Sequence, residues 1–147
     1  MIDFPAPDPA AQKLSAALSS VIREDIAGSD GSIPFARYME RCLYEPGLGY
    51  YSAGLQKFGS GGDFVTAPEV SPLFGQCIAR SCSAVLASLG GGDILEFGAG
   101  SGRLALDLIA GLERLDALPR GYLILERSAE LRQRQQETLR EHLPQLV

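Results

Sequence analysis

One stretch of the sequence decides the fold: Ile94-Leu95-Glu96-Phe97-Gly98-Ala99-Gly100-Ser101-Gly102-Arg103-Leu104, a short apolar strand that runs into three alternating glycines and then a helix. Glycines at alternate positions permit a tight turn with positive φ and leave no Cβ to block a ligand. The helix that follows directs unpaired N–H groups into the same crevice. Ligands bind in such crevices at the carboxyl ends of strands in open α/β sheets. The stretch therefore predicts a nucleoside-cofactor site.

The spacing of the glycines separates the cofactor classes. The dinucleotide fingerprint G-x-G-x-x-G needs its third glycine at position 103, where this chain has Arg103. A phosphate-binding P-loop is also disfavoured, because no Lys-Ser or Lys-Thr pair follows Gly102. The carboxylate of Glu96, two residues before the first glycine, suits an ammonium and a sulfonium better than a pyrophosphate. The pattern favours S-adenosylmethionine, and a glycine turn without a ligand is the alternative.

A second apolar strand, Gly121-Tyr122-Leu123-Ile124-Leu125, ends at Glu126. In a βαβ unit, an acidic residue roughly 20 residues beyond the glycine turn binds the ribose hydroxyls of the cofactor. We expect Glu126 to fill this role. The alternative is a solvated charge at the start of the next helix, where the helix dipole stabilises it.

Composition excludes several classes of partner. A net charge of −5 argues against a nucleic-acid backbone as partner, because nucleic-acid-binding domains usually carry a basic stripe. The three cysteines (Cys42, Cys77, Cys82) form no C-x-x-C pair, and the single histidine, His142, stands in a polar stretch, so the sequence predicts no metal site and reduced, buried thiols. The acidic, proline-rich start is typical of neither a signal nor a transit peptide. No apolar run approaches the ~20 residues that span a bilayer. We therefore expect a cytoplasmic protein without a membrane span.

The remaining pattern predicts the element order. Apolar spacing predicts a helix from Asp8-Pro9 to Gly28 and a shorter one from Ser32-Ile33-Pro34 to Pro46-Gly47. Residues 47–70 form a glycine-rich, aromatic-bearing loop of the kind that is functional or disordered, and its end, 63–70, is predicted to be extended. A helix follows from Ser71-Pro72 to Gly90, and we expect it to turn a set of apolar side chains inward: Leu73, Phe74, Ile78, Cys82, Val85, Leu86 and Leu89.

From residue 93 the order strand, turn, helix, strand, helix is typical of the opening of a doubly wound α/β sheet. We therefore divide the chain into residues 1–92, a helical and glycine-rich amino-terminal region, and residues 93–147, the first β-α-β-α part of a Rossmann-like domain. Because such a sheet needs more than two strands, we expect the chain to be an amino-terminal piece of a longer protein. Exposed sheet edges leave open a homodimer that would cover them.

Four blocks of the sequence resemble the MidA family, which comprises class I S-adenosylmethionine-dependent methyltransferases and includes the mitochondrial complex I assembly factor that methylates arginine. The blocks are residues 33–39, 43–46 with 49–51, 62–71 with 74–75, and 96–102. The Gly-Asp-Phe-x-Thr-x-Pro-Glu block at 62–69 is far more specific than a glycine turn. The resemblance runs from about residue 15 onward and implies a Rossmann-like class I methyltransferase fold, truncated, behind a helical lead.

The resemblance also implies roles for individual residues. The methionine and ribose parts of S-adenosylmethionine would lie against Glu96, Gly98, Ala99, Gly100 and Gly102, with Glu126 on the ribose hydroxyls. Thr66, Pro68 and Glu69 would close the site from the amino-terminal side. Arginine methylation needs a carboxylate that holds the guanidinium, and bidentate geometry suits this. Glu69 is the candidate catalytic residue; the alternative is a charge at a helix N-terminus.

The preferred function is protein-arginine methylation by in-line displacement, with positioning supplying much of the rate. Only the resemblance implies a protein substrate, such as an NADH dehydrogenase subunit. One alternative is a non-catalytic assembly or binding module whose tyrosine-bearing loop binds a partner. An NAD-dependent oxidoreductase is a further alternative, against which Arg103 speaks.

Overall fold

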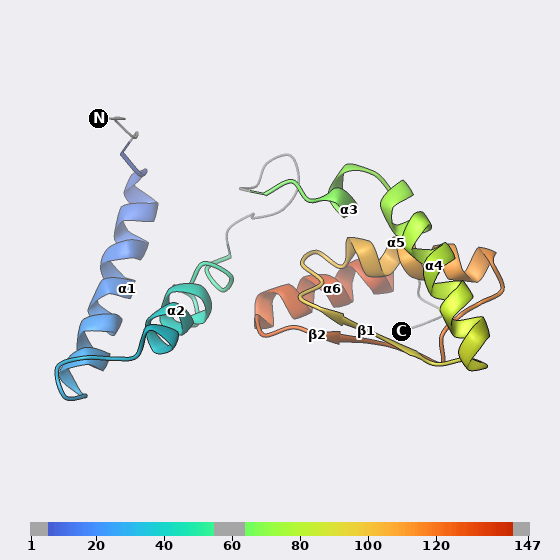
Figure 1. The fold of residues 1–147 in the computed structure, drawn as a ribbon. Helices are drawn as coiled ribbons and strands as arrows, with labels where there is room; N and C mark the ends of the chain where they lie inside the picture. The colour runs from blue at the N-terminus through green and yellow to red at the C-terminus, as the bar shows by residue number, and fades with distance from the viewer. Residues whose placement is uncertain (1–5, 55–63, 143–147) are drawn as a thin grey trace, which may run out of the picture. The chain divides into compact units, whose positions relative to one another are not determined.

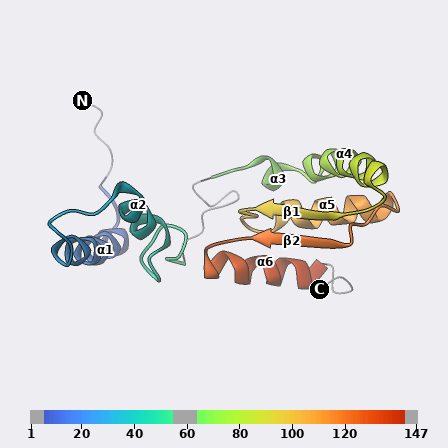
Figure 2. The same cartoon turned by 60° about the horizontal axis from the view of Figure 1, so that its bottom comes forward.

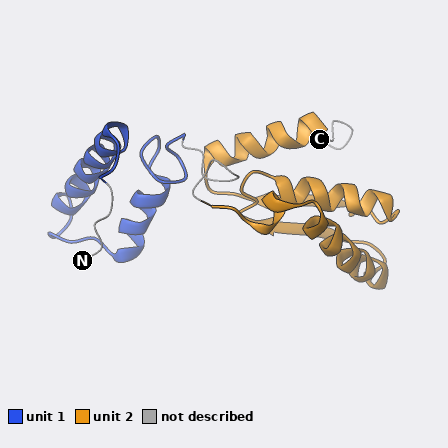
Figure 3. Ribbon diagram, turned by 90° about the horizontal axis from the view of Figure 1, so that it is seen from above, with its two compact units in different colours: residues 1–55 blue, residues 56–147 orange. Residues whose placement is uncertain are grey.

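The computed structural model describes residues 6–54 and 64–142 (Figure 1). Contacts divide the chain into two compact units, residues 1–55 and residues 56–147 (Figure 3). This division falls earlier than the boundary expected at residue 92, because helix α4 (Leu73–Leu89) packs on helix α5 (Arg103–Arg114). The helix that precedes the first strand therefore belongs to the same unit as the sheet.

The first unit is a pair of helices. Helix α1 (Pro9–Ala27) begins after Asp8, whose side chain accepts a 2.8 Å hydrogen bond from the Ala11 N–H, and ends at Gly28. Such a cap satisfies one of the N–H groups that a helix start leaves unpaired. Helix α2 (Phe35–Tyr44) begins after Pro34. Both helices lie where the sequence predicted them.

Asp25 on α1 holds the two helices of the first unit together. Its Oδ2 accepts hydrogen bonds from Arg37 Nε at 2.9 Å and from Arg41 Nε at 2.7 Å, both on α2. Arg37 also binds Glu40, and Arg41 also binds Glu45. These bonds hold the pKa of the Asp25 carboxyl below its ordinary value, the bond from Arg41 most strongly and that from Arg37 next.

The second unit builds a small α/β sheet. Its elements follow in the order α3 (Ala67–Val70), α4, β1 (Asp93–Phe97), α5, β2 (Gly121–Leu125) and α6 (Ala129–His142). The strands are parallel, with Leu95 opposite Leu123 and Phe97 opposite Leu125. Figure 2 shows the two arrows side by side, and Figures 1 and 2 together place α4, α5 and α6 on one side of them. This order confirms the expected mixed α/β architecture with a parallel β-α-β unit.

The segment before α4 differs from the prediction. Residues 67–70 form one helical turn, α3, so the extended segment predicted over 63–70 is wrong there. Pro68 stands in the first turn, where its fixed φ favours a helix start and its missing N–H costs nothing. Residue 63 and much of the glycine-rich stretch, 55–63, lie outside the described residues.

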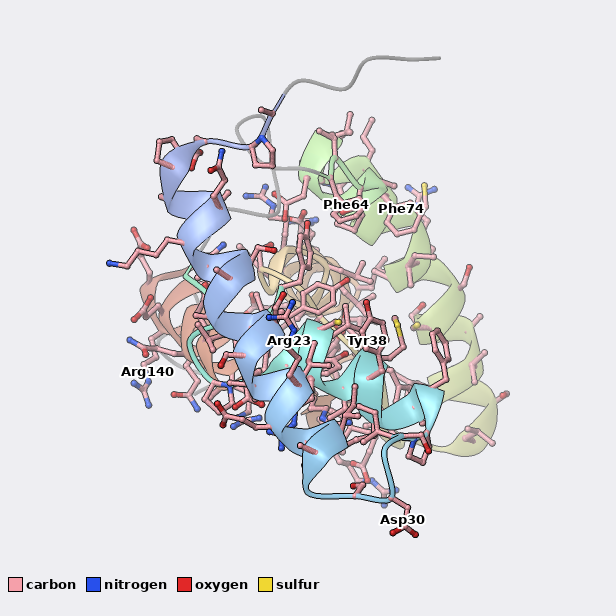
Figure 4. The ribbon with its side chains drawn as sticks, turned by 90° about the vertical axis from the view of Figure 1, so that its left-hand side faces the viewer. Arg23, Asp30, Tyr38, Phe64, Phe74 and Arg140 are labelled. Carbon is pink, nitrogen blue, oxygen red and sulfur yellow. The ribbon has the colours of Figure 1, made fainter. Side chains whose placement is uncertain are left out.

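The core of the second unit lies between α4 and α5, where Ala79, Leu86, Leu108 and Leu112 are buried together. The inward set predicted for α4 is wrong for four of its seven members: Leu73, Phe74, Val85 and Leu89 are exposed by 64%, 40%, 56% and 69%. Figure 4 labels Phe74, in the first turn of α4, together with Phe64, which precedes α3 and is also exposed. Cys77 is exposed too, against the expectation of buried thiols.

Small residues explain this packing. A Cβ on Gly75 would lie 2.5 Å from Asp107 Cβ, and a Cβ on Gly111 would lie 2.6 Å from Ala79 Cβ. The two helices therefore approach closely through Gly75, Ala79 and Gly111, and Leu86 adds a large side chain to this contact.

The sheet face opposite the helices is apolar and exposed. Leu95, Phe97, Leu123 and Leu125 stand on it and are exposed by 54%, 71%, 53% and 60%. Parallel sheets are normally covered on both faces. Within the described ranges, no helix combines the length and the apolar character needed to cross a membrane.

Candidate cofactor site

A pocket of about 320 Å³ lies at the carboxyl end of β1. Its lining consists of Thr66, Pro68, Glu69, Glu96, Phe97, Gly98, Ala99, Gly100, Ser101, Arg103 and Leu104. The volume falls in the range of small-molecule sites. The fold thus brings together seven of the nine residues predicted from the sequence. Gly102 and Glu126 are not part of this lining.

The glycine turn has the backbone that its sequence requires. Gly98, Gly100 and Gly102 have φ of 66°, 56° and 84°, in the left-handed region that favours glycine. A Cβ on Gly98 would meet no described atom within 4 Å, so the space beside this residue is open to a ligand. The Gly98 N–H donates to Leu125 O at 3.0 Å, which ties the turn to β2.

Gly102 serves another purpose. It is buried directly before α5, and a Cβ there would lie 3.3 Å from Gln135 Cα on α6. Its N–H donates to Ala99 O at 2.8 Å and closes the turn. Gly102 therefore allows α6 to pack closely on the turn.

Glu96 places a half-buried carboxylate in the pocket wall. The Tyr122 hydroxyl on β2 donates a 2.7 Å hydrogen bond to Glu96 Oε2. Burial raises the pKa of the Glu96 carboxyl above its ordinary value, and the bond from Tyr122 acts in the opposite direction. Burial, and next the bond to Glu96, raise the pKa of Tyr122, so this hydroxyl stays a donor. A partly desolvated carboxylate interacts strongly with a positively charged group.

Glu69 is joined to the turn through Ser101. The Ser101 hydroxyl donates to Glu69 Oε1 and accepts a 3.3 Å bond from the Arg103 N–H at the start of α5. The carboxylate thus fixes α3 to the glycine turn. It has acceptor capacity left, because an ionised carboxylate offers about four lone-pair sites.

Glu126 lies just beyond the carboxyl end of β2, the strand that pairs with β1. Its Oε1 accepts a 2.9 Å bond from the Ser128 N–H, and its Oε2 accepts a 3.2 Å bond from Gln135 Nε2. Each oxygen keeps a free lone pair under this arrangement. Ser128 and Gln135 therefore orient the Glu126 carboxylate, which can still accept hydrogen bonds from hydroxyls.

Sequence reasoning missed two groups of residues. Phe97, Ser101, Arg103 and Leu104 line the pocket and are direct neighbours of the glycines, so adjacency could have found them. Three more residues reach the site from other elements. The Tyr122 side chain on β2 bonds to Glu96, and the side chains of Gln135 and Thr138 on α6 bond to the glycine turn. For Gln135 there was a signal, because it interrupts an apolar series of spacing four, Leu131-Gln135-Leu139. Among the described residues no cluster of His, Cys, Asp and Glu could hold a metal ion.

Comparison with known proteins agrees with this geometry. A family model described as "Putative S-adenosyl-L-methionine-dependent methyltransferase" matches residues 77–147. The protein arginine methyltransferase NDUFAF7 of Danio rerio, a mitochondrial protein, is 36% identical over 58% of this chain. Its homolog in Caenorhabditis elegans is 32% identical over 74% of this chain. The chain spans only 21% and 27% of the lengths of these two relatives.

A solved structure is similar over nearly the whole chain. The crystal structure of a candidate methyl transferase from Burkholderia thailandensis, bound to S-adenosyl-homocysteine, superposes with a TM-score of 0.84 at 49% identity. It covers 98% of this chain, which corresponds to 38% of that protein. A second crystal structure from the same organism gives a TM-score of 0.79 at 46% identity.

Proposed function

Because the chain belongs to the MidA family of S-adenosylmethionine-dependent methyltransferases, we propose that its pocket holds S-adenosylmethionine and that the protein methylates arginine side chains of a protein substrate. One observation carries the proposal: the Glu96 carboxylate and the open glycine turn form one wall of the same pocket. A similar chain at 49% identity binds S-adenosyl-homocysteine.

The residues fit this cofactor. The open space beside Gly98 lets a ligand lie against the backbone, and the Glu96 carboxylate suits the ammonium of the methionine part. Glu126 has acceptor capacity for ribose hydroxyls. Thr66 and Pro68 line the pocket from the segment around α3. We propose that the second unit is the first part of a Rossmann-like class I methyltransferase domain.

The bound cofactor supplies a methyl group on a sulfonium, which a nitrogen can displace. The chain's own residues supply orientation. Glu69 has a carboxylate that is anchored on one oxygen by Ser101, and we assign its remaining acceptor sites to the substrate guanidinium. A guanidinium held in this way presents one nitrogen in a fixed direction, and positioning of this kind accounts for a large part of many rate enhancements.

The substrate, the assembly and the location of the protein are proposals. The family resemblance implies an NADH dehydrogenase subunit, which is the proposed substrate. A homodimer that covers the exposed sheet edges is the proposed assembly. A cytoplasmic location stays a prediction from the sequence, and the relatives above carry the word mitochondrial in their names.

The test of transfer uses methyl-labelled S-adenosylmethionine, the protein and a panel of arginine-containing respiratory subunits, followed by amino-acid analysis. We expect label on arginine that disappears in Glu69→Gln, while cofactor binding remains. Label on another side chain, or equal label with Glu69→Gln, would contradict the assigned reaction or the role of Glu69.

A further inference from the structure

The buried side-chain amide of Gln135 joins the glycine turn to Glu126. Gln135 on α6 is 3% exposed, and its Nε2 donates to Gly100 O at 3.0 Å and to Glu126 Oε2 at 3.2 Å. Both partners can only accept hydrogen bonds when Glu126 is ionised, so the amide nitrogen has to face them. Each of its two N–H bonds then has its own acceptor.

The surrounding contacts hold this amide in place. A Cβ on Gly102 would lie 3.3 Å from Gln135 Cα, so α6 lies directly against the turn. One helical turn further on, the Thr138 hydroxyl donates to Ser101 O at 3.0 Å. Leu139, four residues after Gln135, packs against the buried pair Leu106 and Ile109. The inward side of α6 is thus apolar except at Gln135 and Thr138, which bond to the carbonyls of the turn and, for Gln135, also to Glu126.

We propose that Gln135 is a positioning residue that fixes the Gly100 carbonyl and the Glu126 carboxylate relative to each other. The Ser128 N–H orients one oxygen of Glu126, and Gln135 orients the other, so the lone pairs left for a ligand point in set directions. The link between turn and carboxylate rests on geometry alone. Its consequence for binding at the ribose end of the cofactor rests on the proposed function.

The first experiment needs no ligand. Amide hydrogen exchange is measured for Gly102 and Ser128, whose N–H groups bond within the turn and to Glu126, with the amides of α5 as reference. Gln135→Leu keeps much of the volume and removes both donors. We expect exchange at Gly102 and Ser128 to become roughly tenfold faster, the change that follows from about 1.4 kcal/mol, with α5 unchanged. Gln136→Leu, at the exposed neighbouring glutamine, should change neither site.

A second variant separates positioning from bulk packing. Gln135→Glu places two carboxylates together, so protection at Gly102 and Ser128 should be lost at neutral pH. It should return in part in acid, where a shared proton restores one of the two bonds. Unchanged exchange in both variants would overturn the proposal. So would equal acceleration at all sites, α5 included, without recovery in acid.

The consequence for the cofactor is measured by titration of S-adenosyl-homocysteine. We expect Gln135→Leu to weaken binding about tenfold and Gln136→Leu to leave it unchanged. Weaker exchange protection with unchanged affinity would overturn the link to the ribose end. If the unaltered protein binds no S-adenosyl-homocysteine, the proposed function fails, while the exchange data still decide whether Gln135 fixes the turn.

Discussion

The Tyr122 hydroxyl lies 2.7 Å from Glu96 Oε2, so the two parallel strands are joined by a side-chain bond as well as by their backbone ladder. Tyr122 stands opposite Ile94 in the register, and the bond therefore runs diagonally along the sheet. The Tyr122 ring packs against the buried core around α5. The core thereby holds a donor in place that orients the pocket carboxylate.

Tyr122→Phe keeps the ring and removes this donor. The bond from Tyr122 lowers the pKa of Glu96, so the variant should raise that pKa further. We also expect S-adenosyl-homocysteine to bind more weakly, by about tenfold, because hydrogen bonds to charged groups contribute on the order of 1.5–3 kcal/mol. Carbon NMR titration of the glutamate carboxyls and calorimetry measure the two effects. Tyr38→Phe in the first unit is the control and should leave both unchanged.

Cofactor binding should depend on pH through Glu96. Burial raises the pKa of this carboxyl above 4.5, so it takes up a proton while ordinary glutamates are still ionised. A protonated Glu96 no longer attracts an ammonium, so affinity for S-adenosyl-homocysteine should begin to fall above pH 4.5 as the solution is acidified. Affinity measured at a series of pH values gives the profile, and Glu96→Gln should flatten it. An unchanged profile in that variant would rule out Glu96 as its source.

Two glycines with the same backbone separate strain from binding. Gly98 in the pocket and Gly90 at the end of α4 have φ of 66° and 67°, and a Cβ on either would meet no described atom within 4 Å. Alanine at either position should therefore cost similar stability, about 1–2 kcal/mol for a left-handed residue. Only Gly98→Ala should also weaken S-adenosyl-homocysteine binding. Urea unfolding and calorimetry on both variants test this, and equal binding by both would contradict the role of Gly98.

Gly111→Ala should destabilise the second unit without a direct effect on the pocket. Its new Cβ would lie 2.6 Å from Ala79 Cβ, and overpacking of this kind costs about 1–3 kcal/mol. Urea unfolding measures the loss. Gly92→Ala is the matched control, since its Cβ would lie 3.4 Å from the end of the Leu86 side chain, an ordinary contact. An equal loss in both variants would contradict the close approach of α4 and α5.

The first unit should lose stability in acid. The arginine bonds lower the pKa of Asp25 below 3.8, so its contribution is complete above that pH and is lost as the pH falls through the lowered value. Asp25→Asn should remove this part of the pH dependence. Thermal unfolding of both proteins between neutral pH and pH 2 measures it, with Asp30→Asn as the control. Parallel curves for Asp25→Asn and the unaltered protein would contradict the role of Asp25.

Local signals in the sequence predicted much of the fold. The glycine turn, the two apolar strands and the first two helices are encoded by local sequence patterns, and the structure confirms them. The packing of α4 could not be read in this way. The side of α4 that carries Gly75 and Ala79 is buried, because these residues contact Asp107 and Gly111 on α5, a helix further along the chain.

In the candidate site, too, local sequence patterns predicted the residues near the turn but not the contacts between separate elements. Seven predicted residues line one pocket because they lie in or beside the glycine turn, on α3 or directly before it, and Ser101 joins α3 to the turn. Gly102 and Glu126 instead contact Gln135, from a helix whose docking depends on the core rather than on local pattern. Side chains that act on other side chains, such as Tyr122 and Gln135, become visible only once the elements are placed in space.

The most direct test of the proposed cofactor site is calorimetric titration of S-adenosyl-homocysteine into the 147-residue chain, with NADH titrated separately as the alternative ligand. We predict saturable binding of S-adenosyl-homocysteine that is strongly weakened in Glu96→Ala, and no binding of NADH. Binding of NADH in its place, or no binding of S-adenosyl-homocysteine by a chain shown to be folded, would contradict this prediction.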